Sequence, residues 1–548
     1  MGLHPGVEQQ LARLAPDQRA AATAPPGPVL CVAPAGSGKT TTLVARICWL
    51  VANGVDPEHV TAVTFNKRAA DELNERLVKA LAPITGDGPQ VRVRTFHALG
   101  REILAEAGVN VRNLVDRAEI VRRLNGKAPS AAAFRRIDDA FSRLKLDLMV
   151  DAGDLRRLTE SGALLPVETD LASAFVAYEE WLAANDSVDF DDLVRRALAR
   201  LQGDGRLREA WQGRCRTLLV DEVQDVDRSQ LELALLLCGD ERDIFLVGDD
   251  DQTIYAWRLA DVRRVLDLAG SLPGLRRIDL VTNYRCPRAV VERAVRLVEG
   301  NQERFAKTIR AGPSAAGELI LAPDPGDDVS RARRLLSRWL LSAPGQHAIL
   351  ARTNAELAPF AAIAIEMGIP YRAAEDGLLL DDPAIEGTLA ALRVAPAEVP
   401  IAVTVARTAS RSRRAHDALL AWSLGARDSK DLIAAVDEAR ARRARLRRDD
   451  AGLILATAHG TKGLEFDHVA CIGLDDGIFP SRRTLEDADD PVRGLEEERR
   501  LCYVAWTRAK RSLTLVYDPQ APSIFLREAF SEEELGLRQR GEGGRKAA

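Results

Sequence analysis

Residues 29–47 (VLCVAPAGSGKTTTLVARI) constrain the fold of this chain more than any other segment. Their apolar start predicts a buried strand, the small residues that follow predict a tight loop, and the spacing from Lys39 onward predicts a helix. Small residues let backbone N–H groups face an anion, and the positive end of a helix dipole favours one. The segment therefore predicts an α/β fold with a phosphate-binding loop at the carboxyl end of a strand.

This loop follows the pattern GxxxxGK[ST] at every fixed position except the first, where Ala33 replaces glycine. We expect Lys39 to reach the β- and γ-phosphates of ATP and the hydroxyl of Thr40 to hold Mg²⁺. The residues expected to contact ATP here are Ala35, Gly36, Ser37, Gly38, Lys39, Thr40 and Thr41.

A second motif supplies the carboxylates that ATP hydrolysis needs. The string TLLVDEVQD (217–225) reads as an apolar strand followed directly by Asp221 and Glu222. We expect Asp221 to bind Mg²⁺ through water and Glu222 to accept the proton of the attacking water. Together with the phosphate loop, this pair predicts an ATP hydrolase.

Composition narrows the class further. The chain has 548 residues, a formal net charge of −5, 46% apolar and 29% charged residues, which is typical of a multidomain globular protein. No apolar run is long enough to span a membrane, so we expect no membrane partner and a cytoplasmic location. The seven cysteines are scattered without a CxxC pair, which argues against a disulfide framework or a zinc cluster.

Apolar runs that alternate with helical segments predict two parallel sheets. Between residues 98 and 188 the apolar spacing is helical, which predicts an insertion in the first sheet domain. The first set of expected strands is 29–33, 60–65, 217–220 and 243–247, and the second is 318–322, 347–351, 452–457, 469–473 and 513–516.

Further strings follow in a fixed order along the chain. They are LAPDQRAA (14–21), AVTFNKRAADEL (62–73), RTFHALG (94–100), VDFDDL (188–193), VGDDDQTIYAWRLA (247–260), NYRCP (283–287), ARTN (351–354), ATAHGTKGLEFDHV (456–469) and EEERRLCYVAWTRAK (496–510). Together with the two motifs above, they resemble the motifs of superfamily 1 helicases. The resemblance is greatest to the UvrD/PcrA/Rep group of 3′-to-5′ DNA translocases, and it runs from about residue 14 to 526.

The resemblance implies further ATP contacts. Gln18 matches the residue that reads adenine, Tyr284 the ring that stacks on it, and Glu465 a residue near the ribose. Gln252 matches the residue that couples the γ-phosphate to the DNA site. Arg285 and Arg508 match two arginines that reach the γ-phosphate, so the resemblance implies a catalytic set of Glu222, Gln252, Arg285 and Arg508.

The resemblance also implies a groove for single-stranded DNA. Exposed aromatic rings suit such a groove because bases of any sequence can stack on them. The expected base contacts are Phe65, Phe96, His97, Tyr255 and Trp257, and the expected backbone contacts are Thr95, Arg258 and His459.

In domain terms, the resemblance implies two RecA-like domains with helical insertions. The first would comprise 1–97 and 189–268 around an insertion at 98–188. The second would comprise 269–394 and 451–535 around a short remnant of the family's second helical insertion at 395–450. A basic, disordered tail is expected at 536–548.

Two departures from the family pattern affect these expectations. Thr41 stands where the family commonly has an arginine that packs on adenine, which weakens the expectation of strict ATP preference. The interval 395–450 is too short for a full helical domain and suggests about two helices. Residues 401–448 carry 12 Lys+Arg against 5 Asp+Glu, so this segment either grips DNA phosphates or forms a solvated helix pair.

The expected function is an ATP-dependent 3′-to-5′ DNA helicase of bacterial type, with ATP and Mg²⁺ as cofactors, acting in repair, recombination or replication restart. Two alternatives stay open: a single-strand translocase or motor subunit that displaces proteins without unwinding DNA, and an ATP-gated DNA-binding scaffold. Expected partners are single-stranded DNA, junctions of single- and double-stranded DNA, and repair or replication proteins. We expect a nucleoid-associated chain that is monomeric or weakly self-associating.

Overall fold

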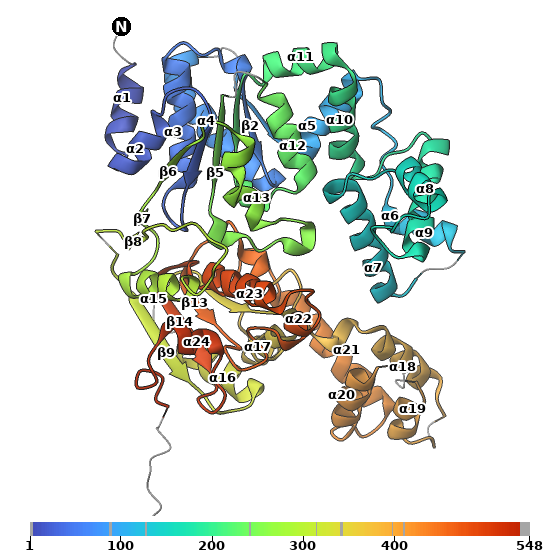
Figure 1. Cartoon of the computed structure of the whole chain (residues 1–548). Coiled ribbons are helices and arrows are strands. Elements are labelled where there is room, and N and C mark those ends of the chain that lie inside the picture. Colours follow the sequence, from blue (N-terminus) through green and yellow to red (C-terminus); the bar gives the residue numbers. More distant parts are fainter. Residues whose placement is uncertain are drawn as a thin grey trace, which may run out of the picture. The chain divides into compact units, whose positions relative to one another are not determined.

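The computed structural model describes residues 4–86, 90–126, 129–239, 243–313, 315–339, 344–396, 398–408 and 412–537 (Figure 1). It divides into two compact units. The first comprises Met1–Tyr284 and Asn301–Pro313, and the second comprises Arg285–Gly300 and Ser314–Ala548. Of the tail expected at 536–548, the part from residue 538 on lies outside the described residues.

The first unit is built on a parallel sheet with the strand order β3-β2-β4-β5-β1-β6. Alternate residues of each strand enter opposite cores, as Val29 and Leu30 of β1 do. Helices α1 to α4 cover one face, and α5, α10, α11 and α12 cover the other (Figure 1). The strands are β1 (Val29–Val32), β2 (Val60–Thr64), β3 (Arg92–Thr95), β4 (Thr217–Val220), β5 (Ile244–Gly248) and β6 (Arg276–Asp279). A short pair, β7 (Thr282–Asn283) and β8 (Arg310–Ala311), is separate.

The helices of this unit precede and follow those strands. They are α1 (Pro5–Ala12), α2 (Pro16–Ala22), α3 (Lys39–Ala52), α4 (Lys67–Thr85), α5 (Phe96–Glu106), α10 (Asp192–Gly203), α11 (Gly205–Arg214), α12 (Arg228–Leu237), α13 (Val262–Leu266) and α14 (Leu268–Ser271). Single helical turns lie at η1 (Pro57–His59), η3 (Val223–Asp225), η4 (Asp250–Gln252) and η5 (Ala256–Arg258).

The first unit extends further than the sequence analysis placed it. Strand β6 pairs with β1, so the chain stays in this unit to Tyr284 instead of leaving it at residue 268. Strands β3 and β6 were not expected. Both lie at the edges of the sheet and are only half-buried, so their sequences RVRT and RRID lack the apolar run that marks a central strand.

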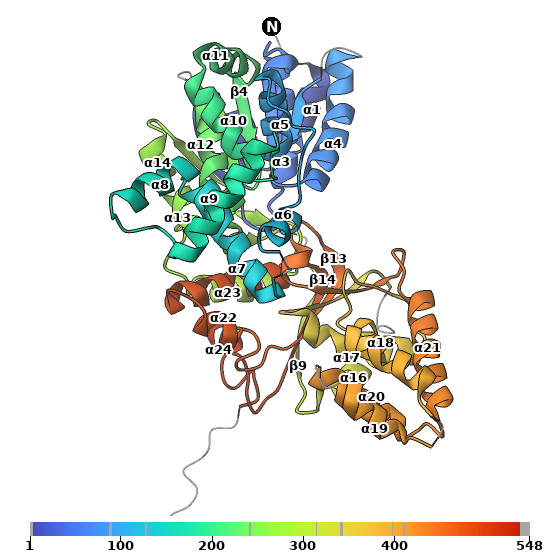
Figure 2. The ribbon, with the colours of Figure 1, turned by 90° about the vertical axis from the view of Figure 1, so that its right-hand side faces the viewer.

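A helical insertion with a core of its own lies between α5 and α10 (Figure 2). Its core includes Ile120, Phe141, Phe175 and Tyr178. Helix α5, which falls inside the expected insertion 98–188, packs instead in the core of the first sheet. The insertion consists of α6 (Arg117–Leu124), α7 (Ala131–Ser142), the π-helical turn η2 (Arg143–Asp147), α8 (Ala152–Glu160) and α9 (Thr169–Ala184).

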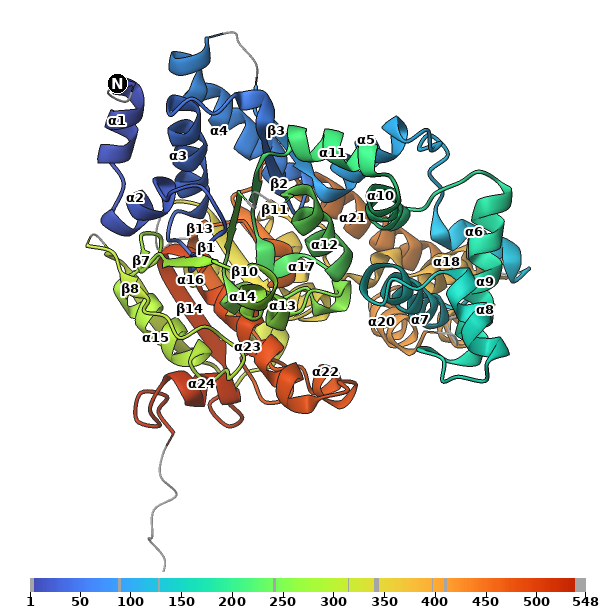
Figure 3. The same cartoon turned by 45° about the horizontal axis from the view of Figure 1, so that its top comes forward.

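The second unit is built on another parallel sheet, with the order β11-β12-β10-β13-β14-β9. Helices α16 and α17 cover one face, and α15, α23 and α24 pack together elsewhere in the unit (Figure 3). The strands are β9 (Glu318–Pro323), β10 (His347–Ala351), β11 (Tyr371–Arg372), β12 (Leu453–Thr457), β13 (Phe466–Cys471) and β14 (Ala509–Tyr517). The helices are α15 (Arg288–Val298), α16 (Asp328–Trp339), α17 (Asn354–Met367), α22 (Arg482–Glu486), α23 (Pro491–Trp506) and α24 (Ile524–Ala529), with single turns η6 (Leu379–Asp381) and η8 (His459–Thr461).

The short segment before β12 is a four-helix group with its own core, where the sequence analysis expected about two helices (Figure 2). It begins before residue 395, because Leu389 and Leu392 of the preceding helix belong to this core. The helices are α18 (Pro383–Val394), α19 (Ile401–Thr408), α20 (Arg413–Ser423) and α21 (Ser429–Leu446).

Several arginines of α21 have partners inside the protein. Arg443 donates to both carboxylate oxygens of Asp376 at 2.6 and 2.9 Å, and Arg440 contacts Glu386 at 3.0 Å and the carbonyl of Leu380 at 2.9 Å. These contacts hold the helix in place. They favour a structural role for part of the Arg-rich segment over the expected grip on DNA. No helix among the described residues combines the length and the apolar character needed to cross a bilayer.

Candidate nucleotide and DNA sites

The strand order of the first sheet collects residues that are far apart in sequence. All of its strands are parallel, so the loops after their carboxyl ends meet at one side of the sheet, the sheet edge that runs across the ends of all six strands. Passing from β6 to β3, this edge carries Tyr284, the loop 33–38, Gln252, Asp221 with Glu222, Phe65, and Thr95 with His97.

The phosphate loop has the backbone geometry that the sequence predicts. Gly36 and Gly38 have φ of 68° and 83°, a region that favours glycine. A Cβ at Gly38 would also lie 2.6 Å from Nε2 of Gln18, so any other residue there would displace the Gln18 side chain. That nitrogen donates to the carbonyl of Ser37 at 2.7 Å, so the expected adenine-reading residue is joined to the loop.

The loop suits an anionic ligand. Among the described residues, the buried hydroxyl of Ser37 has no hydrogen-bond partner. The ammonium of Lys39 lies 3.3 Å from Oε2 of Glu222, so the expected phosphate contact and the expected base are neighbours. Thr41, in the first turn of α3, is exposed. An orphaned hydroxyl, a lysine and a helix N-terminus together fit the phosphates of ATP.

The two expected acidic residues lie in different environments. Asp221 is buried, and burial followed by the neighbouring Glu222 raises the pKa of its carboxyl to about 7, with Lys39 acting in the opposite direction. Glu222 adopts a left-handed conformation with φ of 52°, which costs a non-glycine residue about 1–3 kcal/mol. This backbone conformation is typical of strain held at a functional site. It leaves the Glu222 carboxylate beside Lys39.

No group of three or more His, Cys, Asp or Glu side chains suited to a metal is present among the described residues. The expected Mg²⁺ ligands, Thr40 and Asp221, are one hydroxyl and one carboxylate. This set fits Mg²⁺ at a nucleotide site, because this ion takes one or two protein ligands and completes its shell with phosphate oxygens and water.

Hydrogen bonds join the expected base to the expected coupling residue. Gln224 donates from Nε2 to Oε2 of Glu222 at 2.6 Å and accepts from the backbone N–H of Asp249 at 2.9 Å. The carboxylate of Asp249 in turn accepts from Nε2 of Gln252 at 2.7 Å. The sequence analysis did not single out Gln224, although it lies inside VDEVQD.

A lysine from a distant segment completes this network. Lys307 is buried against three consecutive carboxylates, with Nζ 2.8 Å from Asp249 and 2.9 Å from Asp251 and a shorter contact to Asp250. All three acidic residues raise its pKa against the effect of burial. Lysine is rare in this chain, and this rarity could have marked Lys307 as a candidate functional residue. Its partners could not be read from the sequence because they lie more than 50 residues away.

Tyr284 lies at the nucleotide end of the edge. Its backbone N–H donates to the carbonyl of Gly36 at 2.8 Å, and its side chain is 50% exposed. An exposed ring fixed to the phosphate loop through its backbone can stack on a base, as the sequence analysis expected.

The remaining expected ATP residues gather in the second unit. Arg285 donates from Nε to Oε2 of Glu465 at 2.8 Å and from Nη1 to the carbonyl of Thr507 at 3.3 Å. Phe466 and Ala509 are paired, so the preceding residues Glu465 and Arg508 are brought to the amino ends of neighbouring strands. Arg508 is buried and donates to backbone carbonyls, including that of Leu464 at 3.1 Å.

Two aromatic stacks lie at the other end of the first sheet's edge. In one, Phe65 stacks on Tyr255 with ring centroids 5.2 Å apart, and Tyr255 meets Trp257 edge-on at 6.0 Å. Trp257 is 62% exposed, and the guanidinium of Arg258 lies 5.0 Å from its ring centroid. The structure thus brings together four residues expected at the DNA groove.

The second stack includes a residue that the sequence analysis missed. His97 stacks on Phe190 with centroids 3.9 Å apart, and Phe190 is 56% exposed. Thr95 ends β3 and caps α5, where its hydroxyl accepts from the N–H of Ala98 at 3.2 Å. Phe190 lies within VDFDDL. A phenylalanine between two aspartates could have marked it as a ring outside the core.

Phe96 is a correction. The sequence analysis expected it to stack on a base, but it is only 2% exposed and packs in the core with Leu30, Val63 and Leu99. Phe96 is the first residue of α5 and faces the core, whereas its neighbour His97 is half-buried and stacks on the exposed Phe190. A ring in the core cannot stack on DNA.

His459 lies after β12 in the second unit. Burial, then Arg352 and Lys462, lowers the pKa of its imidazole to about 4, so the ring is neutral at neutral pH. A neutral imidazole can donate one hydrogen bond to a DNA backbone oxygen, but it adds no positive charge.

Two family models match the chain: the UvrD/REP helicase N-terminal domain over residues 14–273 and the UvrD-like helicase C-terminal domain over residues 430–520. ATP-dependent DNA helicase UvrD2 of Mycobacterium tuberculosis is 32% identical over 556 residues, covering 92% of this chain and 78% of UvrD2. ATP-dependent DNA helicase Rep of Escherichia coli is 26% identical over 621 residues, covering 92% and 90% of the two chains. ATP-dependent DNA helicase PcrA of Staphylococcus aureus is 25% identical, covering 92% and 84%.

Proposed function

Because the chain belongs to the UvrD/Rep family of ATP-dependent DNA helicases, we propose that it uses ATP hydrolysis to move 3′ to 5′ along single-stranded DNA and to separate duplex strands. One observation supports this most directly. The edge of the first sheet that carries the phosphate loop, Asp221 and Glu222 also carries the exposed aromatic stacks. Gln252 and Tyr255 follow the same strand, β5, and Glu222 and Phe65 follow the adjacent strands β4 and β2, so nucleotide and DNA contacts would lie close together.

In this proposal each residue at the nucleotide end has one role. The loop N–H groups and Lys39 hold the phosphates, and Thr40 and Asp221 hold Mg²⁺, which would neutralise phosphate charge when bound. Glu222 accepts a proton from the attacking water, and Gln252 senses the γ-phosphate. Contacts of Arg285, Arg508 and Glu465 with the nucleotide are proposed from the resemblance.

At the DNA end, the proposed base contacts are Phe65, Tyr255, Trp257, His97 and Phe190. Stacking on such rings is worth about 1–3 kcal/mol per base with little sequence preference, which suits a motor that must move along any sequence. The proposed backbone contacts are Thr95, Arg258 and His459.

A second candidate is a single-strand translocase that does not unwind duplex DNA by itself. It is favoured by the small size of the four-helix group α18–α21. The alignment with Rep spans 621 positions, more than the 548 residues of this chain, so Rep carries residues that this chain lacks. We propose this activity as the alternative: a translocase, or the motor subunit of a larger assembly, that displaces proteins from DNA.

Unwinding of fluorescent duplexes with a 3′ tail, a 5′ tail or blunt ends tests both candidates, with Glu222→Gln as the inactive control. ATP-dependent separation of only the 3′-tailed duplex is the expected result. ATP hydrolysis stimulated by single strands without any separation would select the translocase. A chain that neither binds single-stranded DNA nor hydrolyses ATP would contradict both.

A further inference from the structure

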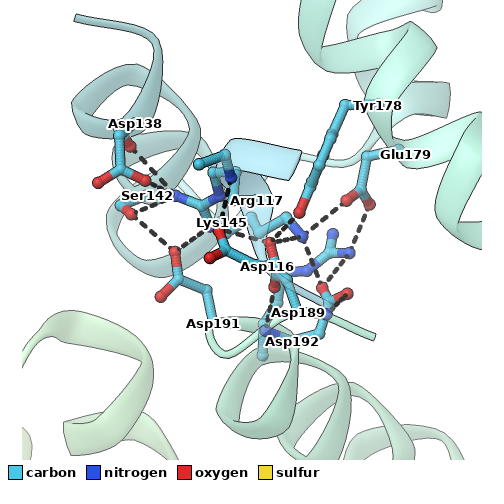
Figure 4. Close-up of polar contacts among 12 residues, drawn as sticks. Asp116, Arg117, Asp138, Ser142, Lys145, Tyr178, Glu179, Asp189, Asp191 and Asp192 are labelled. Carbon is cyan, nitrogen blue, oxygen red and sulfur yellow. Dashed lines mark hydrogen bonds and ion pairs between the residues drawn. The ribbon is translucent and has the colours of Figure 1, made fainter. Parts of the chain in front are cut away.

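A network of buried charges lies where the helical insertion meets the first sheet domain (Figure 4). Its centre is Lys145, which is fully buried and contacts three carboxylates: Glu179 at 2.8 Å, Asp189 at 2.9 Å and Asp192 at 2.9 Å. The hydroxyl of Tyr178 donates to the same oxygen of Asp189 at 2.9 Å. None of the proposed nucleotide or DNA contacts uses this lysine.

Arg117, at the start of α6, forms the second half of the network. Its Nη2 donates to Asp189 at 2.9 Å and to Asp191 at 2.5 Å, while Nη1 donates to Ser142 at 2.9 Å and to Asp138 at 2.7 Å. Ser142 passes a further hydrogen bond to Asp191 at 2.7 Å. Residues of the insertion therefore hold the carboxylates of both Asp189 and Asp191 in place.

Three of the acidic members come from one turn, VDFDDL, whereas Glu179 and Asp138 belong to the insertion. The carboxylates of Asp189, Asp191 and Asp192 face the buried cations, and Asp189 and Asp192 also accept each other's backbone N–H, at 2.9 and 3.3 Å. Phe190 lies between them and is 56% exposed. Because its two neighbours are fixed inward, the ring of Phe190 is directed outward, where it stacks on His97 at 3.9 Å.

Lys145 and Arg117 belong to the insertion, whereas Asp192 begins α10 of the sheet domain, and Arg195 of α10 reaches back to Glu179 of the insertion at 2.6 Å. Lys145 lies in the π-helical turn η2, where Leu144 belongs to the core of the insertion. Asp147, at the end of the same turn, pairs with Arg264 of α13 in the sheet domain. The network therefore joins the insertion to the element that carries Phe190.

We propose that this network positions an aromatic ring for DNA: Lys145, Arg117 and the hydroxyls of Ser142 and Tyr178, which hold the same carboxylates, fix the VDFDDL turn so that Phe190 presents its ring, stacked on His97, to a base of single-stranded DNA. This inference rests on the proposed function. It gives the helical insertion a part in DNA binding without requiring that it touch DNA.

Stability alone is a weak reason for such a network. A buried ion pair often contributes no more than well-packed apolar residues of the same volume, and its best-attested benefit is a defined local geometry. Here the geometry that it defines ends in an exposed aromatic ring at the DNA end of the sheet edge.

A double-mutant cycle tests the proposal with the full chain and a fluorescein-labelled oligothymidylate. Lys145→Met leaves three buried carboxylates with one cation fewer and can fail to fold, so the main variant is the pair Ser142→Ala and Tyr178→Phe. This pair removes hydrogen bonds to Asp191 and Asp189 and keeps every charge. It is combined with Phe190→Ala, and the Kd for the oligonucleotide is measured in each background.

We expect the pair to raise Kd about three- to tenfold when Phe190 is present and by less than about twofold when it is alanine. The size follows from stacking, which is worth about five- to 150-fold per base, and from partial misalignment of the ring. An equal rise in both backgrounds would overturn the proposal, because the network would then act without Phe190.

Phe175→Leu, in the core of the insertion, is the matched control. It lowers stability without removing a hydrogen bond or a charge of the network, so it should leave Kd unchanged. An equal rise of Kd in this variant would also overturn the proposal. Failure of the proposed function is distinguishable: Phe190→Ala with unchanged Kd removes only this inference, whereas a wild-type chain that does not bind the oligonucleotide removes both.

Discussion

The side-chain amide of Gln224 donates to the carboxylate of Glu222 at 2.6 Å, two residues earlier in the chain. Its carbonyl oxygen accepts the backbone N–H of Asp249, and a Cβ on Gly248 would lie 2.3 Å from that oxygen. Gln224 is 1% exposed, so water cannot replace either contact. An amide suits this place because it donates to a carboxylate at one end and accepts an N–H at the other.

Gln224→Glu should therefore lower ATP turnover by about ten- to 100-fold. A glutamate could still accept from Asp249, but it would place a second carboxylate against Glu222 and lose about 1.5–3 kcal/mol of a hydrogen bond to a charged group. Steady-state hydrolysis with and without single-stranded DNA measures the effect. Gln212→Glu is the control. The side-chain amide of Gln212, on α11, donates to the carbonyl of Leu236 on α12 and lies outside the network. Equal losses in the two variants would contradict the assignment.

Trp257 and Phe96 should respond to truncation in opposite ways. Trp257→Ala should weaken binding of single-stranded DNA by about 1–3 kcal/mol and leave the unfolding midpoint nearly unchanged, because the ring is exposed. Phe96→Ala should cost about 3–5 kcal/mol of unfolding free energy, because this ring is in the core. Fluorescence anisotropy with labelled DNA and thermal unfolding measure the two effects. A stable Phe96→Ala chain with weakened DNA binding would restore the expectation from the sequence.

The nucleotide half of the sheet edge could be predicted because its chemistry is local. Asp221 follows an apolar strand directly, and Lys39 follows one after a loop of small residues, so the strand-to-loop pattern identifies both without knowledge of the fold. Lys307 could not be found this way, because its carboxylate partners come from a distant loop. The prediction that Phe96 contacts DNA was wrong for a related reason. Phe96 and His97 are adjacent aromatic residues, and which of them faces the core depends on how α5 packs, which the sequence alone does not show.

Substitutions of Arg443 and Arg445 distinguish two interpretations of the Arg-rich segment 401–448, a structural role inside the protein and a grip on DNA phosphates. Arg443→Ala should lower the unfolding free energy of the second unit by about 3–5 kcal/mol, because it leaves the buried Asp376 carboxylate without its bidentate partner. Arg445 is exposed, so Arg445→Ser should change stability by less than about 0.5 kcal/mol. Thermal unfolding compares the two variants. The salt dependence of DNA binding provides a second readout: a flatter slope in Arg443→Ala at unchanged stability would favour a grip on phosphates instead.

The lowered pKa of His97 predicts that the first unit loses stability in acid. Burial lowers the pKa of its imidazole from 6.5 to about 4, with Asp191 opposing this shift and Arg258 adding to it. Above about pH 6.5 the ring is neutral in both the folded and the unfolded chain. As the pH falls from there toward 4, the unfolded chain binds a proton that the folded chain does not, so stability decreases across this window.

His97→Gln should therefore reduce the difference in unfolding midpoint between about pH 7 and about pH 5 without abolishing it, because His459 has a similarly lowered pKa in the second unit. Denaturant unfolding at the two pH values measures the change, and His59→Gln, at the exposed turn η1, is the control. A pH dependence that is identical in the wild-type chain and in His97→Gln would show that the ring is already accessible to protons, and the tight stack with Phe190 would then not persist in solution.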